Sequence, residues 1–424
     1  MYQNYTAALN APDKPERLAA LRKIIGLHKT GALGMPEKSE NVNNHIHTTY
    51  SFSPYSPSKA AYAAWKSGLA TAGIMDHDSV AGAEEFLEAG KIAGIATTVG
   101  FELRCDLRGT PLMGRKTNNP DQTSVTYLTM HGIPHGQIAR AEKFLRPCRE
   151  KRNIRNRAMV EKLNLIFEKH GVALDFCADV VPVSNCRDGG SITERHILFA
   201  LSKKIIEKTG RGTALVNFLA DSFGISVTGA NLGRIMDVEN EMYAYFLLNI
   251  LKGQLVERFY IDATDECPPV SEFLGLAGEI GAIPAYPYLG DVSDSVTGDK
   301  KKQAFEDGYL DELVEYAASA GFKALTFMPT RNTPEQLARV MALCEKHGLF
   351  QICGEDINSP FQPFVCEALK KPEFKHLVRA AWALIGHERA ERGMFSAEMI
   401  EQMPELGKRI EHFAKLGLKA GFNE

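Results

Sequence analysis

Seven short apolar runs constrain the fold of this chain more than any other feature of its sequence. Each run is bounded by turn residues, a pattern that predicts a β-strand. The runs cover residues 42–47, 71–75, 96–103, 124–130, 283–288, 324–328 and 350–354. Segments with helical spacing separate them, and this alternation predicts a parallel sheet, closed or open, in the α/β class. A chain of 424 residues is long enough for one large α/β barrel with an insertion or for two ordinary domains.

The alternation is interrupted once, by a helix-rich stretch between residues 136 and 280. Within it, the segment from Gln137 to Gly171 is strongly basic and predicts a long helical hairpin. Helix starts elsewhere, such as Thr333 followed by Pro334, belong to the alternating pattern. We therefore expect an N-terminal helical extension, a barrel in two parts separated by a helical insertion or cap, and C-terminal helices, with boundaries at residues 1–40, 41–135, 136–280, 281–372 and 373–424.

The composition gives no reason to expect a polyanionic or membrane partner. The net charge is −3, and 24% of the residues are charged. Eight cysteines are scattered without a C-x-x-C pair, which suits neither a disulfide framework nor a zinc ribbon. The first residues lack the apolar stretch of a secretory signal, and no run approaches the roughly 18 apolar residues of a membrane span. We expect a soluble, reduced, cytoplasmic protein that binds neither nucleic acid nor membrane.

Histidines and carboxylates follow several of the predicted strands. His45 and His47 lie two residues apart in "NNHIHTTYS", so on a strand both imidazoles point to one face. Other apolar runs end in the same residue types, at Asp76, His77, Glu102, Glu355 and Asp356. In a parallel α/β barrel the carboxyl ends of the strands converge on one mouth, where such folds place their chemistry. An H-x-H motif alone often occurs by chance, and Glu102 or Asp356 alone would more often be a helix-capping or hydrogen-bonded carboxylate, but their joint placement predicts a metal site.

The types of side chain also indicate which ion such a site prefers. Two neutral imidazoles and two carboxylates suit zinc, manganese or iron better than calcium or magnesium, because nitrogen ligands disfavour the hard ions. An ion of this kind lowers the pKa of a bound water and polarises an ester or amide oxygen. The pattern therefore predicts hydrolytic chemistry.

These motifs resemble the polymerase and histidinol phosphatase (PHP) family of metal-dependent phosphoesterases. The resemblance rests on His45-Ile46-His47 followed by "TTYS" and "SP", then on "GIMDHDSVAG" and "VGFE", and it covers roughly residues 40–365. The arginine-rich segment, "SITERHILFAL", and "GAIPAYPYLGD" before "GEDINSP" are similar to the nucleotide and nucleoside phosphatase branch, which carries a helical insertion. The resemblance implies a distorted, TIM-like (β/α) barrel of seven strands, in agreement with the seven apolar runs.

The resemblance also implies a set of metal ligands. The first metal of the family takes both histidines of the H-x-H motif, the glutamate after the third strand and the aspartate of the last motif, which are His45, His47, Glu102 and Asp356. The other two metals each lack two ligands, with Thr126, Tyr286, Phe52 and Asn358 in the ligand positions. We therefore expect one divalent ion, zinc, manganese or iron, rather than three, unless His131 or His135 substitutes for a missing ligand.

Five further residues are candidates for catalysis or substrate binding. Asp76 and His77 are the expected proton-handling groups, because a histidine without its metal titrates near neutrality, although His77 is equally consistent with a hydrogen-bonded residue that fixes the site. By resemblance, the insertion contributes cations to a substrate phosphate. The family has an arginine and a histidine there. His196 matches the histidine, whereas Glu194 falls on the arginine position and Arg195 lies one residue after it. Tyr286 either contacts a substrate oxygen or fills the space of a metal.

The arginines of the basic segment have mostly helical spacing. Such a charge run predicts a solvated helix face, with an inward-facing anion site as the alternative. The arginines are Arg146, Arg149, Arg152, Arg155 and Arg157.

The leading functional hypothesis is a metal-dependent hydrolase of the PHP type that acts on a small phosphate monoester or related anionic ester. Because one ion stabilises the charge of a phosphoryl transition state less than three do, two alternatives stay open. One is one-metal hydrolysis of an amide or lactone, or an isomerase or lyase reaction, on a substrate without phosphate. The other is a protein that binds a ligand and keeps its metal without catalysis.

Overall fold

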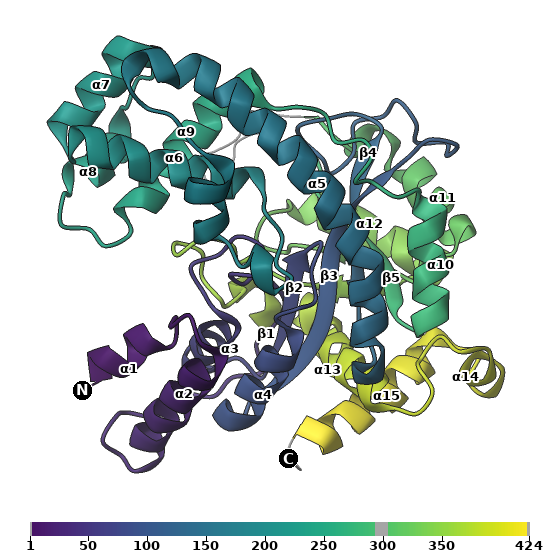
Figure 1. The fold of residues 1–424 in the computed structure, drawn as a ribbon. Helices are drawn as coiled ribbons and strands as arrows, with labels where there is room; N and C mark the ends of the chain where they lie inside the picture. The colour runs from purple at the N-terminus through teal and green to yellow at the C-terminus, as the bar shows by residue number, and fades with distance from the viewer. Residues whose placement is uncertain (1, 293–303, 422–424) are drawn as a thin grey trace.

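The computed structural model describes residues 2–292 and 304–421, and these contain the seven expected strands in one sheet. Neighbouring strands follow the order of the sequence, and a bridge between Ile46 and Ile357 brings the two edges together. The sheet is therefore nearly closed into a barrel (Figure 1), as predicted. The strands are β1 (Val42–Ile46), β2 (Thr71–His77), β3 (Ala96–Asp106), β4 (Val125–His131), β5 (Ile283–Pro287), β6 (Ala324–Phe327) and β7 (Phe350–Cys353).

One strand runs against the expected direction. β4 pairs antiparallel with both β3 and β5, whereas the other pairs are parallel, so the prediction of a wholly parallel sheet was wrong at this strand. The physical reason lies in residues 107–124, which join β3 to β4 without a helix. A parallel connection needs a crossover, usually helical, whereas an antiparallel neighbour needs only a loop.

Helices cover the outside of the barrel and begin where the sequence provides caps. Ser56 accepts a hydrogen bond from the backbone of Lys59 at the start of one helix, and Thr333 forms a capping box with Gln336 at the start of another. The helices that follow or precede the barrel strands are α3 (Pro57–Lys66), α4 (Ala83–Ala93), α10 (Val270–Ile280), α11 (Leu310–Ala320) and α12 (Pro334–His347). The N-terminal helices α1 (Tyr2–Ala8) and α2 (Lys14–Lys29) pack beside α3 and α4.

The C-terminal helices close the end of the barrel where most strands begin. They are α13 (Lys375–Arg389), α14 (Ala397–Gln402) and α15 (Leu406–Gly421). Their apolar side chains form one core with the first residues of four strands, which are Ala96, Ile283, Ala324 and Phe350. This packing leaves the carboxyl ends of the parallel strands available to form a site.

The basic segment forms one helix, α5 (Ile138–Phe167), so the expected helical hairpin was wrong. Thirty residues of α-helix extend for about 45 Å, which carries the chain from the end of antiparallel β4 along the whole barrel. The first half of α5 packs in the barrel core, and its second half packs in a separate core of the insertion. A single helix therefore links the barrel to the helical insertion.

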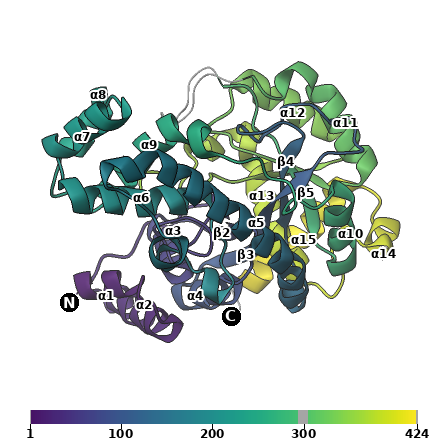
Figure 2. The same ribbon diagram turned by 45° about the horizontal axis from the view of Figure 1, so that its top comes forward.

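The insertion continues as four further helices with a hydrophobic core of their own. These are α6 (Glu194–Thr209), α7 (Thr213–Phe223), α8 (Gly229–Met236) and α9 (Tyr243–Phe259). Both views place them together, on the opposite side of the molecule from α10 and α11 (Figures 1 and 2). No helix in the described residues is long and apolar enough to cross a membrane.

Candidate metal centre

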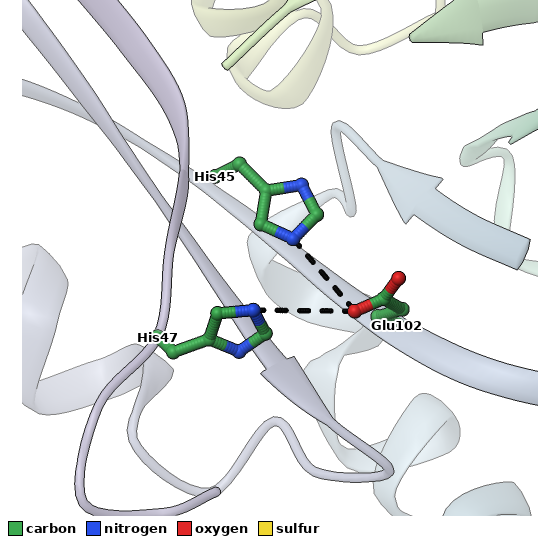
Figure 3. A group of neighbouring side chains, drawn as sticks. All are labelled: His45, His47 and Glu102. Atoms are coloured by element: carbon green, nitrogen blue, oxygen red, sulfur yellow. Dashed lines mark ion pairs between the residues drawn. The ribbon is translucent and has the colours of Figure 1, made fainter. Parts of the chain in front are cut away.

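The H-x-H motif lies at the end of β1, facing the end of β3. The Nε2 atoms of His45 and His47 are 3.7 and 3.9 Å from Oε2 of Glu102 (Figure 3). On the other side of the same oxygen, Nδ1 of His77 at the end of β2 is 3.1 Å away. The ends of two neighbouring strands, β1 and β2, thus direct three imidazoles at the carboxylate of β3, as strand alternation and barrel geometry predict.

The chemistry of this cluster fits a divalent ion. The Nε2 atoms of His45 and His47 and Nδ1 of His77 are all buried without a hydrogen-bond partner, which is rare for buried polar atoms. Burial alone would raise the pKa of Glu102, but the surrounding imidazoles, His77 foremost, hold it below its usual value. Among the described residues, His45, His47 and Glu102 form a group whose ligand atoms all lie within 4.8 Å of one another. Such a group can hold a metal through nitrogen and oxygen.

A hydrogen-bonded chain orients His47. Ser51 Oγ donates to Oδ1 of Asp76 at 2.6 Å and lies 3.2 Å from Nδ1 of His47. Because its single proton is given to Asp76, Ser51 accepts from Nδ1 of His47, which leaves the lone pair on Nε2 toward Glu102. Partners of this kind typically orient metal-binding histidines. Asp76 also accepts two hydrogen bonds from Thr48, so its carboxylate is engaged within the protein.

Asp356, the fourth predicted ligand, approaches the cluster from the loop after β7. Its Oδ1 is 3.1 Å from Nε2 of His47 and accepts a hydrogen bond from Nδ2 of Asn358 at 2.7 Å. Burial opposes the charge of this carboxylate, but the neighbouring His47 brings its pKa well below the usual value. The structure therefore brings all four predicted ligands to one place, with Asp356 at the edge of the group.

The residues at the altered ligand positions have partners within the protein. Phe52 is 5% exposed and packs its ring against His196, Phe199 and Tyr245 of the insertion. Tyr286 donates its hydroxyl to Glu306. Burial raises the pKa of Glu306 to about 7. At these two ligand positions, the side chains thus pack against the insertion or form hydrogen bonds within the protein.

A cavity of about 150 Å³ opens above the cluster. Of the predicted site residues, His45, His77, Glu102, Asp356 and Arg195 line it. Two predicted substrate-binding residues and one predicted catalytic residue are absent from the lining, namely His196, Tyr286 and Asp76.

Separate contacts account for the histidines outside the cavity. Nδ1 of His196 accepts from the backbone of Thr193 as part of a capping box, and burial lowers the pKa of His196 to about 3. His131 is buried at the end of antiparallel β4, and His135 pairs with Glu388 at 3.2 Å. Neither His131 nor His135 belongs to the candidate metal group found in the described residues.

Several lining residues were missed by sequence reasoning. They include Tyr127 of β4, Glu194 and Lys252 of the insertion, and Tyr288 and Phe327 of the barrel. For Tyr127 the missing information was the register, in which Glu102 pairs with Thr129 and Arg104 with Tyr127. Tyr127, and not the expected Thr126, therefore shares the inner face with Glu102, while Thr126 pairs with Cys105.

The arginines of α5 are partly buried in ion pairs. Arg149, Arg152 and Arg155 are each less than 10% exposed, so the expectation of a solvated face was wrong for these three. Arg152 contacts both Asp78 and Glu194. Carboxylates thus neutralise the buried guanidinium groups and fix α5 to the barrel, because an unpaired buried charge is costly.

The fold and the site define a class of protein: a nearly closed α/β barrel with a buried histidine and carboxylate cluster at the carboxyl ends of its strands. Residues 43–197 match the model of the PHP domain, so this part of the chain is similar to that family. The sequence has no match among curated proteins.

Two solved structures share the fold. A proposed metal-dependent phosphoesterase from Bifidobacterium adolescentis is 18% identical, with a TM-score of 0.51, over 80% of this chain and 96% of the other. An amidohydrolase from Chromobacterium violaceum, solved with bound sulfate and no metal, is 16% identical, with a TM-score of 0.50, over 77% of this chain and 90% of the other. At these identities the likeness shows the fold alone.

Proposed function

We propose that this chain is a metal-dependent hydrolase that cleaves a small phosphate monoester or a related anionic ester. The observation that carries the proposal is the set of three buried imidazole nitrogens without hydrogen-bond partners around the Glu102 carboxylate. A divalent ion held there supplies Lewis acidity and a nucleophile at neutral pH. The PHP domain match, and the names of the two structural neighbours as a phosphoesterase and an amidohydrolase, support hydrolysis as the class of reaction.

In this proposal the chain divides its residues between holding the ion and handling protons. His45, His47, Glu102 and Asp356 hold one zinc, manganese or iron ion. His77 is the proton-handling residue, because it lines the cavity and its Nδ1 faces the cluster. Burial lowers the pKa of His77 to about 4, below the near-neutral value expected from the sequence, so the imidazole is neutral at pH 7 and is a weaker base than a free imidazole. Asp76 acts through Ser51, by orienting His47.

The cavity suggests the size and charge of the substrate. Its volume of about 150 Å³ is comparable with a cavity that holds one benzene ring, so the enclosed part of the substrate is small. Arg195 and Lys252 line it, and two cations near a metal favour an anionic group. We therefore propose a small anionic molecule as substrate.

The test begins with the metal. The purified full chain is reconstituted with zinc or manganese and analysed for bound metal; one equivalent per chain is expected, and two or more, or none, would contradict the one-ion site. Release of phosphate is then measured across a panel of small monoesters. The Glu102→Ala variant is expected to lose both metal and activity, whereas Glu84→Ala, which removes an exposed glutamate of α4, keeps both. Folding of each variant is checked by circular dichroism.

A second candidate is hydrolysis of an amide or lactone without phosphate. It is favoured by Glu194, whose carboxylate lines the cavity and would repel a dianion. Burial alone would raise the pKa of Glu194, but Arg152 and Arg104 keep it low, so the carboxylate is charged at neutral pH. Turnover of amides or lactones, with no phosphate released from any monoester, would select this reaction. Tight ligand binding without any turnover would instead indicate a binding protein.

A further inference from the structure

Tyr127 presents a hydroxyl that the protein itself does not use. The residue lies on β4, lines the cavity, and has its ring centroid 5.6 Å from that of His77. Asn118 holds its backbone through hydrogen bonds of 2.8 and 3.0 Å. Its hydroxyl, however, makes no hydrogen bond within the described residues. The ring is thus fixed in place while its polar group is left available.

The other two tyrosines near the mouth differ in this respect. Tyr286 donates its hydroxyl to Glu306, and Tyr288 donates to Asp307. Tyr127 is half-buried and lines the cavity, so its uncommitted hydroxyl is available to a partner from outside the chain. Burial raises the pKa of Tyr127 well above its usual value, so the hydroxyl keeps its proton.

Arg104 lies behind the Tyr127 ring, on the same inner face of the barrel. The two residues are paired in the β3–β4 register, and the guanidinium carbon is 5.8 Å from the ring centroid. Arg104 is 2% exposed and donates to the Tyr260 hydroxyl, but it forms no ion pair in the described part of the chain, and its Nη2 has no partner. A buried positive charge that no carboxylate contacts directly makes a neighbouring hydroxyl a stronger donor.

We infer that the Tyr127 hydroxyl donates a hydrogen bond to a substrate oxygen that gains negative charge during cleavage, and that Arg104 strengthens this bond from behind the ring. Tyr127 is then a catalytic residue and Arg104 a positioning residue. The inference rests on the proposed hydrolytic site, since it assigns a donor to the reaction of that site. A donor aimed at developing charge stabilises the transition state more than the ground state.

The first experiment compares Tyr127→Phe with wild type in the zinc-loaded full chain. Turnover of p-nitrophenyl phosphate is expected to fall about 100-fold in kcat, on top of any rise in KM that matches the loss of phosphate affinity. Binding of inorganic phosphate is expected to weaken about tenfold or more, because a hydrogen bond to a charged group is lost. The near-ultraviolet difference spectrum that phosphate induces in wild type should lose its tyrosine component. Tyr245→Phe is the matched control, since its ring packs on Phe52 outside the cavity lining.

The second experiment tests Arg104. Arg104→Met breaks no ion pair among the described residues but loses the hydrogen bond to Tyr260, so it is expected to cost about 1 kcal/mol of unfolding free energy and still to fold. It should weaken phosphate binding in the wild-type background but cause no further loss in Tyr127→Phe, because the two residues act as one unit. An equal loss in both backgrounds would remove Arg104 from the inference.

Two outcomes overturn the role of Tyr127. One is wild-type phosphate affinity and an unchanged difference spectrum in Tyr127→Phe; the other is a wild-type chain that binds no phosphate. If wild type releases no phosphate from any monoester while Tyr127→Phe still weakens phosphate binding, the proposed function fails, and Tyr127 is an anion-binding donor rather than a catalytic residue.

Discussion

Ser51→Ala is expected to weaken metal binding, although it replaces none of the proposed metal ligands. Ser51 Oγ lies between Nδ1 of His47, at 3.2 Å, and Oδ1 of Asp76, at 2.6 Å. Removal of the hydroxyl leaves the His47 ring free to adopt the other tautomer, with a proton on the Nε2 that faces Glu102. Loss of such a partner typically costs 10- to 100-fold in metal affinity, or about 1.4 to 2.7 kcal/mol.

The cost to folding is separate and smaller. The variant loses one buried hydrogen bond to Asp76, which costs about 1 kcal/mol of unfolding free energy. Thr48→Val is the matched control, because the Thr48 hydroxyl donates to the other Asp76 oxygen at 2.6 Å without contacting His47. It should lose a similar free energy of unfolding and keep its metal affinity. Zinc affinity is measured by calorimetry against a competing chelator, and stability by urea unfolding of the metal-free chain.

The reasoning is refuted by either of two results. Ser51→Ala with the zinc affinity of wild type would show that the hydroxyl does not orient His47. Equal weakening of zinc binding by Ser51→Ala and Thr48→Val would show that Asp76 merely holds the loop after β1.

Three further predictions concern stability, each measured by urea unfolding. Phe52→Ala should lower the free energy of unfolding by about 3 to 5 kcal/mol, because a ring buried among three aromatic groups of the insertion is removed. Asp78→Asn should cost about 3 kcal/mol, because Arg152 loses a buried counterion while the backbone (φ of 52°) still accepts asparagine. Glu306 has a pKa raised to about 7, so the folded chain holds a proton that the unfolded chain releases above about pH 4.5. Stability should therefore fall by about 2 kcal/mol more between pH 5 and 7.5 in wild type than in Glu306→Gln.

The order of the strands could be predicted because each is a local apolar run between turn residues. The direction of β4 was missed, although residues 107–124 contain no helical pattern between two expected strands. Since a parallel connection needs a crossover, that absence was an available signal for an antiparallel pair. The long α5 helix was mistaken for a hairpin even though the segment offers no turn residues apart from Pro147.

The metal ligands could be proposed from sequence because H-x-H spacing and strand ends are local features. Tyr127 could not, since its place beside Glu102 depends on a register across two strands. The buried state of Arg152 was equally hidden, because its partners Asp78 and Glu194 come from distant segments. The local sequence pattern therefore predicts which residues lie at the end of each strand. The residues that surround them depend on pairing between segments that are distant in the sequence.

The residues at the altered ligand positions are well packed or hydrogen-bonded, in agreement with the proposed one-ion site. Replacement of a ligand by an unrelated side chain would by itself leave a cavity or an unsatisfied polar group, because neighbouring side chains relax only partly to fill the space. Phe52 instead joins the core of the insertion, and Tyr286 donates to Glu306. Asn358 donates to Asp356, which orients a carboxylate of the remaining cluster. The same substitutions that remove ligands thus hold the insertion and the remaining carboxylate in place, so restoring Asp at position 52 should destabilise the chain rather than recover a second ion.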